Sequence, residues 1–162
     1  MAKERLSADL VDFLQENRVV SLITVNRESR LPELTTVSWV RTSQNGGEVR
    51  IAVMHKASSV KNLLVNDHAT LGVIGAGSCW SIEGRATVSE VIRETMKFRV
   101  VTLKVEKVKN VIFYGGEITA DPAYIRNYNP VLAEKLDEEA ECLLRRDHNE
   151  NELLESAIEK VL

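Results

Sequence analysis

The 162-residue sequence is poor in the features that mark membrane, secreted and fibrous proteins. It contains only three prolines, eight glycines and two cysteines. No stretch approaches the roughly 18 uncharged apolar residues that a membrane-spanning helix requires. The first residues lead into an amphipathic pattern and not into the apolar core of a signal peptide. We therefore expect a cytoplasmic protein with one domain and no contact with a membrane.

Motifs for metal binding and for hydrolysis are also missing. Cys79 and Cys142 lie far apart, and the three histidines never cluster with them at the spacing of a zinc site. No Walker sequence and no Gly-x-Ser-x-Gly sequence occurs. The sequence thus predicts free thiols, no metal site and no catalytic side chain.

The net charge of −3 is unevenly distributed. Residues 1–117 carry a net charge of +3, and residues 118–162 carry −6. A mildly basic region can receive an anionic ligand, whereas an acidic segment suits a solvated helical surface. A dense basic face is absent, so we expect no nucleic-acid partner.

The hydrophobic pattern predicts a mainly β fold with flanking helices. Strands are expected over residues 19–25, 34–41, 48–54, 69–74, 80–91, 98–108 and 111–114. An N-terminal helix is expected over about 7–17, with Ser7 as its cap, and a short helix over 59–65 after the third strand. Gly84 interrupts its strand and indicates a bulge or a close backbone approach. Six or seven mostly antiparallel strands form a closed or nearly closed barrel more readily than an open sheet.

The character of the sequence changes to helical after residue 117. Asp121-Pro122 and Asn129-Pro130 each predict a helix start. The second of these helices is expected to bury Leu132, Leu136, Ala140, Leu143 and Leu144. A third apolar stripe covers residues 153–161. We therefore divide the chain into a barrel with its N-terminal helix (1–117) and an acidic helical extension (118–162), packed on the barrel or on a second copy.

One segment combines hydroxyl and ammonium groups at the start of a helix. It reads His55-Lys56-Ala57-Ser58-Ser59-Val60-Lys61-Asn62-Leu63 and directly follows a strand. Unpaired N–H groups and the helix dipole favour an anion at such a position, and lysine adds positive charge. From the residues alone, the simpler interpretation is a helix that Ser58 or Ser59 caps while the lysines are solvated.

Five short motifs occur in a fixed order along the first two thirds of the chain. They are Val20-Ser21-Leu22-Ile23-Thr24-Val25; Pro32 with Thr36-Val37-Ser38-Trp39; Ser-x-x-Lys-Asn-Leu; Asn66 with an Ala-Thr-Leu strand; and Ile82-Glu83-Gly84-Arg85-Ala86. In order, spacing and expected element, the run from Val19 to about Gly116 resembles the pyridoxamine 5′-phosphate oxidase-like FMN-binding family. The resemblance implies a six- to seven-stranded antiparallel split β-barrel with a short inserted helix.

The resemblance also implies a homodimer with two FMN molecules at the subunit interface. Carried onto this chain, the cofactor-binding positions are Thr36, Val37, Ser38, His55, Lys56, Ser58, Ser59 and Lys61. Backbone groups around Val37 would meet the polar edge of the isoalloxazine. The Cys79–Trp80 end of the long strand would approach the flavin bound mainly by the other subunit.

The sequence departs from the true oxidases at the phosphate site and at its C-terminal end. Those enzymes direct arginines at the phosphate from the second strand and from the loop, where this chain has Thr35 or Thr36, Ser58 and Ser59. Hydroxyls and lysines hold a phosphate less firmly than bidentate arginine does. No tryptophan follows Trp80, whereas the oxidases bind pyridoxal phosphate with a C-terminal tryptophan and arginines. The chain thus looks more like the general stress protein and flavin reductase branch.

Three functions remain open from the sequence. The first is an FMN-dependent oxidoreductase that uses NAD(P)H or a small-molecule substrate and needs no catalytic side chain. The second is a non-catalytic protein that binds flavin or another anionic cofactor, as in stress sensing. Haem would require an axial histidine, and only His55 lies near the expected site. The third is an interaction domain without cofactor.

Overall fold

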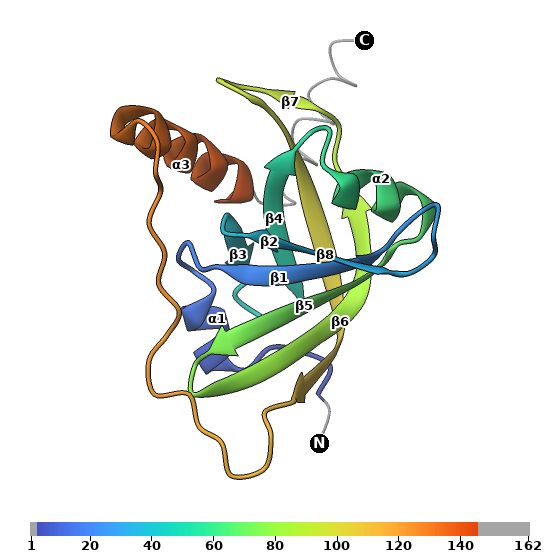
Figure 1. The fold of residues 1–162 in the computed structure, drawn as a ribbon, viewed down its shortest axis with the longest axis vertical. Coiled ribbons are helices and arrows are strands. Elements are labelled where there is room, and N and C mark those ends of the chain that lie inside the picture. Colours follow the sequence, from blue (N-terminus) through green and yellow to red (C-terminus); the bar gives the residue numbers. More distant parts are fainter. Residues whose placement is uncertain (1–2, 146–162) are drawn as a thin grey trace.

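The molecule is built on one antiparallel sheet that curls into a split barrel (Figure 1). The computed structural model describes residues 3–145. Its strands are β1 (Val20–Val25), β2 (Pro32–Val37), β3 (Val40–Thr42), β4 (Glu48–Met54), β5 (His68–Gly75), β6 (Ser78–Val88), β7 (Ile92–Arg93) and β8 (Lys97–Asn110). The order across the sheet is β2-β1-β5-β6-β8-β4-β3, and the short β7 pairs with β8. The expected mainly β fold with antiparallel strands is confirmed.

The curl of the sheet follows from the connection between its two edge strands. β2 and β3 lie at opposite ends of the strand order, yet only Ser38 and Trp39 separate them in the chain. Three Cα–Cα steps span at most about 11 Å, so the two edges must come close together. They do not pair with each other, since β2 pairs with β1 and β3 with β4. The barrel therefore stays split along this line.

Two short helices help to close the barrel core. α1 (Ala8–Phe13) begins after Ser7, whose Oγ accepts a hydrogen bond from the Leu10 amide at 3.3 Å, as the sequence predicts. α2 (Ser58–Val65) buries Val60 and Leu63 among the side chains inside the barrel. The largest fully buried strand residues of this core are Leu22, Ile51, Leu71, Ile82 and Leu103.

The long helix α3 (Pro130–Arg145) packs on a second, smaller cluster, at the upper left of Figure 1. This cluster consists of Ala52, Phe98, Val100, Leu136, Ala140, Leu143 and Leu144. Asn129 Oδ1 accepts hydrogen bonds from the amides of Val131 and Leu132 at 2.9 and 3.3 Å, so the predicted helix start is confirmed. Leu132 itself is 39% exposed, and Ala133 is buried in its place.

Gly84 marks a β-bulge, as its position in the sequence predicts. The register between β6 and β8 shifts between Glu83 and Gly84. A Cβ atom on Gly84 would lie 2.0 Å from the carbonyl oxygen of Lys104. Only glycine therefore allows β8 to pass this closely.

Several predicted element bounds are wrong. Residues 34–41 do not form one strand. They contain the end of β2 and the start of β3, because the chain crosses the split at Ser38 and Trp39. Residues 111–129 contain neither the strand expected at 111–114 nor the helix expected at Asp121-Pro122. Asp121 Oδ1 accepts instead from the Ala76 amide at 3.3 Å, which fixes this segment along the barrel. The apolar stripe predicted over 153–161 lies outside the described residues.

Candidate functional site

A hollow of about 270 Å³ lies where the barrel is split. It is lined by Thr35, Thr36, Val37, Ser38, Trp39, Ala52, Val53, Met54, Ala57 and Ser59. The pairing of β3 with β4 ends at Val40 and Ile51, and the Ala52 amide donates to the Trp39 carbonyl at 3.0 Å. Beyond this bond, the end of β4 lies beside the hollow without a partner strand on that side. β2 borders the other side as an edge strand, so alternate backbone groups point away from β1. The wall therefore combines backbone donors and acceptors with short side chains.

Four hydroxyl side chains line the hollow without hydrogen-bond partners in the described part of the chain: Thr35, Thr36, Ser38 and Ser59. Ser59 is the most buried of these four residues, at 4% exposed. Buried polar groups are normally paired, and groups left open at a concave surface are available to a ligand.

The N-terminus of α2 is open as well. Its cap position is Ala57, which offers no side-chain hydrogen bond, so the alternative interpretation, in which Ser58 or Ser59 caps the helix, is wrong. Within residues 3–145, the amides of Ser58 and Ser59 donate to no acceptor, whereas the Val60 amide reaches the Ala57 carbonyl at 3.1 Å. Free amides together with the helix dipole favour an anion here.

The tryptophan wall of the hollow is fixed from α3. Trp39 Nε1 donates to Asp137 Oδ1 at 2.7 Å, and the Trp39 ring meets Phe98 edge-on at a centroid distance of 5.5 Å. Arg126 forms a hydrogen-bonded ion pair with the same Asp137, and the hydrogen bond in this pair raises the pKa of Arg126. The C-terminal helix thereby holds one side of the hollow in place.

The structure brings together four of the eight predicted site residues. Thr36, Val37, Ser38 and Ser59 line the hollow. His55, Lys56, Ser58 and Lys61 do not line it. The two lysines are exposed and form no ion pair with another described residue, so their charges remain available beside the start of α2.

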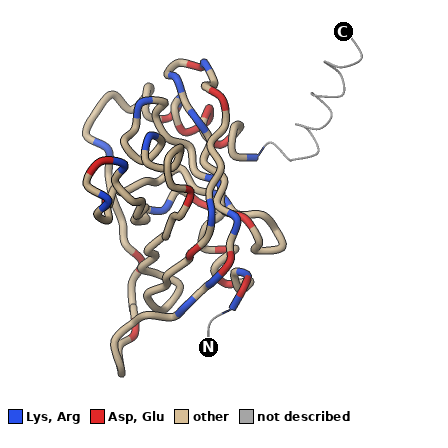
Figure 2. Tube along the Cα trace, turned by 90° about the vertical axis from the view of Figure 1, so that its right-hand side faces the viewer, with Lys and Arg blue, Asp and Glu red and all other residues tan. Residues whose placement is uncertain are grey.

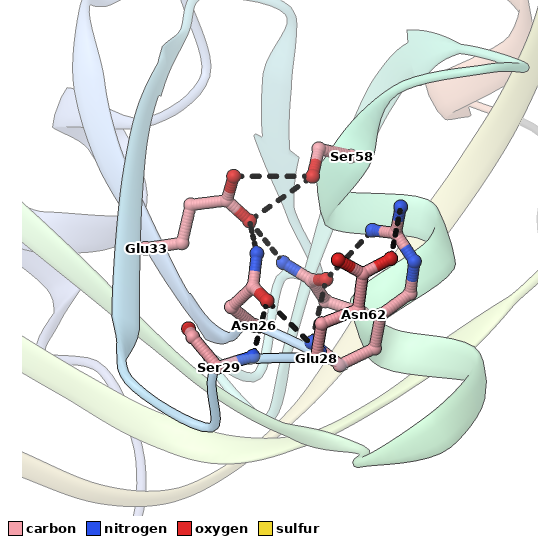
Figure 3. A network of polar contacts seen from close by, with 7 residues as sticks. Asn26, Glu28, Ser29, Glu33, Ser58 and Asn62 are labelled. Carbon is pink, nitrogen blue, oxygen red and sulfur yellow. Dashed lines mark hydrogen bonds and ion pairs between the residues drawn. The ribbon is translucent and has the colours of Figure 1, made fainter.

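A polar network joins the start of α2 to the turn between β1 and β2 (Figure 3). The Ser58 hydroxyl donates to Glu33 at 3.0 and 3.1 Å, and Asn62 Nδ2 donates to the same carboxylate. Asn62 also donates to Thr24 Oγ1 at 3.0 Å and accepts from the Arg27 amide at 3.2 Å. Hydrogen bonds from Asn62 and then Ser58 hold the pKa of Glu33 below its ordinary value.

Sequence reasoning missed the role of Glu33 in this network. Its strand, Pro32–Val37, otherwise shows apolar and hydroxyl residues. A single carboxylate on an edge strand is common in itself, and only the folded chain brings its partners from α2. Sequence reasoning also missed Ala52, Val53 and Met54 as parts of the wall.

The long strand β6 gives the expected Cys79–Trp80 end a defined environment. Trp80 Nε1 donates to the Gly75 carbonyl at 3.1 Å, and its ring packs against the barrel core. Cys79 is half-buried and free. Figure 2 shows Lys and Arg interspersed with Asp and Glu along the described chain. None of the helices within residues 3–145 has the length and apolar character that a membrane span needs.

The residues of the hollow fit the phosphate end and the ring edge of a flavin mononucleotide. Open amides, hydroxyls and nearby lysines suit a phosphate, and backbone groups of β2 suit a polar heterocycle. A volume of about 270 Å³ is near the lower limit for small-molecule sites, which run from about 300 to 1,000 Å³. The hollow of one chain therefore has room for only part of a molecule of this size.

Comparison with known proteins agrees on the fold. No protein-family model and no curated protein matches the chain. A proposed pyridoxamine 5′-phosphate oxidase of Lactobacillus delbrueckii is 17% identical, with a TM-score of 0.56, and the match covers 66% of this chain and 95% of that one. General stress protein 26 of Bacillus anthracis is 11% identical, with a TM-score of 0.51 and coverage of 62% and 88%. An F420 reductase is 12% identical, with a TM-score of 0.50 and coverage of 60% and 94%.

Identities this low establish the fold and nothing finer. The chain is a split β-barrel of the pyridoxamine 5′-phosphate oxidase-like type. The resemblance drawn from the ordered sequence motifs is confirmed at this level.

Proposed function

We propose that the protein binds FMN in the hollow at the barrel split, with the phosphate at the N-terminus of α2. Ser59, the amides of Ser58 and Ser59, and the flexible Lys56 and Lys61 would hold the phosphate. The backbone of β2 around Val37 would contact the edge of the ring system. Bound FMN would supply the hydride or electron chemistry, and these residues would bind and orient it.

The observation that carries this proposal is the convergence of unpartnered donors. Ser59 is 4% exposed as a residue, it lines the hollow, and it lies on the first turn of a helix without a side-chain cap. Its hydroxyl has no hydrogen-bond partner in the described part of the chain and is not among the fully buried polar atoms, so it is open to a ligand in the hollow. A phosphate satisfies this hydroxyl and the free amides at the same time.

A homodimer would complete the site. The irregular segment 111–129 and the start of α3 expose several large apolar side chains: Val111, Phe113, Tyr114, Ile125 and Val131. Phe113 is 76% exposed and Ile125 is 83% exposed. A second copy of the chain covering this surface would also bring the further walls that a flavin needs. Sedimentation should give a dimer, and a stable monomer at micromolar concentration would contradict this part of the proposal.

Flavin binding is tested by titration of the purified protein with FMN. We expect quenched flavin fluorescence, a perturbed visible spectrum and one FMN per chain. A protein that leaves the spectrum of added FMN unchanged would refute the proposal. Titration with deazaflavin F420 serves as the comparison, because one protein of the same fold is an F420 reductase.

An oxidoreductase role is a separate step. Reduction of bound FMN by NADH or NADPH, followed by return of the flavin spectrum in air, would support an enzyme. Stoichiometric FMN that neither nucleotide reduces would favour the second candidate, a flavin-binding stress protein. The exposed, unpaired lysines near the hollow keep both candidates open, since they suit any anionic cofactor.

A further inference from the structure

The carboxylate of Glu33 lies against the first residue of α2 (Figure 3). It accepts the Ser58 hydroxyl at 3.0 and 3.1 Å, and Asn62 and Asn26 donate to it as well. These hydrogen bonds keep the pKa of Glu33 below its ordinary value, so the group is ionised at neutral pH. A fixed negative charge therefore lies beside a helix N-terminus that is otherwise open.

The same helix terminus is the proposed phosphate position. A hydroxyl donates one hydrogen bond, so while Ser58 donates to Glu33 it cannot donate to a phosphate. Two anions near one helix terminus also repel each other, whereas each alone is stabilised by the dipole. Glu33 thus lowers the affinity of this site for a dianion and leaves its affinity for an uncharged ring unchanged.

We propose that Glu33 sets the charge selectivity of the cofactor site, by holding the Ser58 hydroxyl and opposing a phosphate dianion at the N-terminus of α2. This inference rests on the proposed flavin function. It adds that the affinity for FMN exceeds the affinity for riboflavin by a smaller factor than the open amides and the lysines alone would produce. Removal of the Glu33 charge should restore that preference.

The test compares FMN with riboflavin on three proteins: the wild type, Glu33→Gln and Glu28→Gln. Glutamine keeps an oxygen that accepts from Ser58 and Asn62, so the network survives without its charge. Glu33→Gln should bind FMN about tenfold more tightly and riboflavin with unchanged affinity, since one unit charge at several ångströms is removed from a partly exposed site. Glu28 belongs to the same turn, is 84% exposed and pairs with Arg27 at 4.0 Å, so Glu28→Gln is a matched charge control that should change neither affinity.

Ionic strength separates an electrostatic role from a structural one. The gain of Glu33→Gln over the wild type should shrink in about 1 M salt, where charges are screened within a few ångströms. A gain that is independent of salt would overturn the inference. An unchanged ratio of FMN to riboflavin affinity in Glu33→Gln would overturn it too, while leaving the flavin function intact. Failure of every variant and of the wild type to bind either flavin would refute the flavin function itself.

Ser58→Ala provides a second variant that does not depend on Glu33→Gln folding. Because its hydroxyl is committed to Glu33 and its amide is kept in alanine, its loss should leave the ratio of FMN to riboflavin affinity within about twofold of the wild-type ratio. A tenfold weaker affinity for FMN with unchanged riboflavin binding would place the Ser58 hydroxyl on the phosphate and overturn the inference.

Discussion

The adjacent serines Ser58 and Ser59 lie on two sides of α2 that differ in their hydrogen bonding. On the side of the β1–β2 turn, Ser58 and Asn62 donate to Glu33, and Asn62 is completely buried. On the side of the hollow, Ser59 and Ser38 have no hydrogen-bond partner in the described part of the chain. One side is a closed network and the other is an open set of donors.

This difference separates groups that hold the fold from groups that are free to hold a ligand. A buried amide with several partners fixes the helix to the strand beside it, and losing one partner leaves the others unsatisfied. An unpartnered hydroxyl at a concave surface contributes little to folding. Stability and binding should therefore respond to different residues of the same short helix.

The largest expected effect is on stability, from the closed side. Asn62→Ala would leave Thr24, which is 2% exposed, and the Arg27 amide without their present partners. We expect the free energy of unfolding to fall by about 3 kcal/mol, as for loss of a buried hydrogen-bond network. Chemical denaturation measures it.

Lys61→Ala is the matched control on the same helix. Lys61 is exposed and adjacent in sequence to Asn62, so its removal should change the free energy of unfolding by less than about 0.5 kcal/mol. Equal destabilisation by both variants would remove the contrast between the two sides.

How much of this contrast the sequence predicts depends on the range of the interactions. Local patterns are sufficient for β4, for the helix after it and for the bulge at Gly84, because each depends on neighbouring residues or on a missing Cβ. They are insufficient at Ser38-Trp39, where an alternating run conceals the crossing from one edge of the sheet to the other. The helix expected at Asp121 fails because its carboxylate bonds a distant amide, that of Ala76.

The same distinction between local and long-range interactions applies to the candidate site. The ordered motifs predict Thr36, Val37, Ser38 and Ser59, which the fold brings to one hollow. They cannot predict that Ser58 turns to Glu33, because that bond joins residues 25 positions apart. Hydroxyl type and helix position are the same for both serines, and only the tertiary partner distinguishes them.

The second-largest expected effect is a loss of FMN affinity when groups on the open side of α2 are removed. Ser59→Ala combined with Lys61→Ala should weaken FMN binding at least tenfold, since a hydroxyl and a charge-assisted hydrogen bond to the phosphate are lost together. The free energy of unfolding should stay within about 1 kcal/mol of the wild type. Fluorescence titration and denaturation on the same preparations check both expectations.

Thr87→Ala combined with Lys104→Ala is the control pair. It removes the same two kinds of group from exposed positions on β6 and β8, where neither side chain has a described partner. FMN affinity should not change in this variant. Unchanged affinity in Ser59→Ala with Lys61→Ala as well would mean that the phosphate lies elsewhere.

The smallest effect is the pH dependence that Glu33 contributes to stability. Its pKa in the folded chain is lowered from 4.5, first by Asn62 and then by Ser58. At pH values between the folded and unfolded pKa, the unfolded chain binds more protons, so this contribution is complete above the unfolded value and is lost as the pH falls through the folded one. Denaturation from about pH 7 to about pH 3 should show the wild type losing stability faster than Glu33→Gln below about pH 4.5. Parallel profiles would mean that the hydrogen bonds of the closed side do not depend on the charge of Glu33.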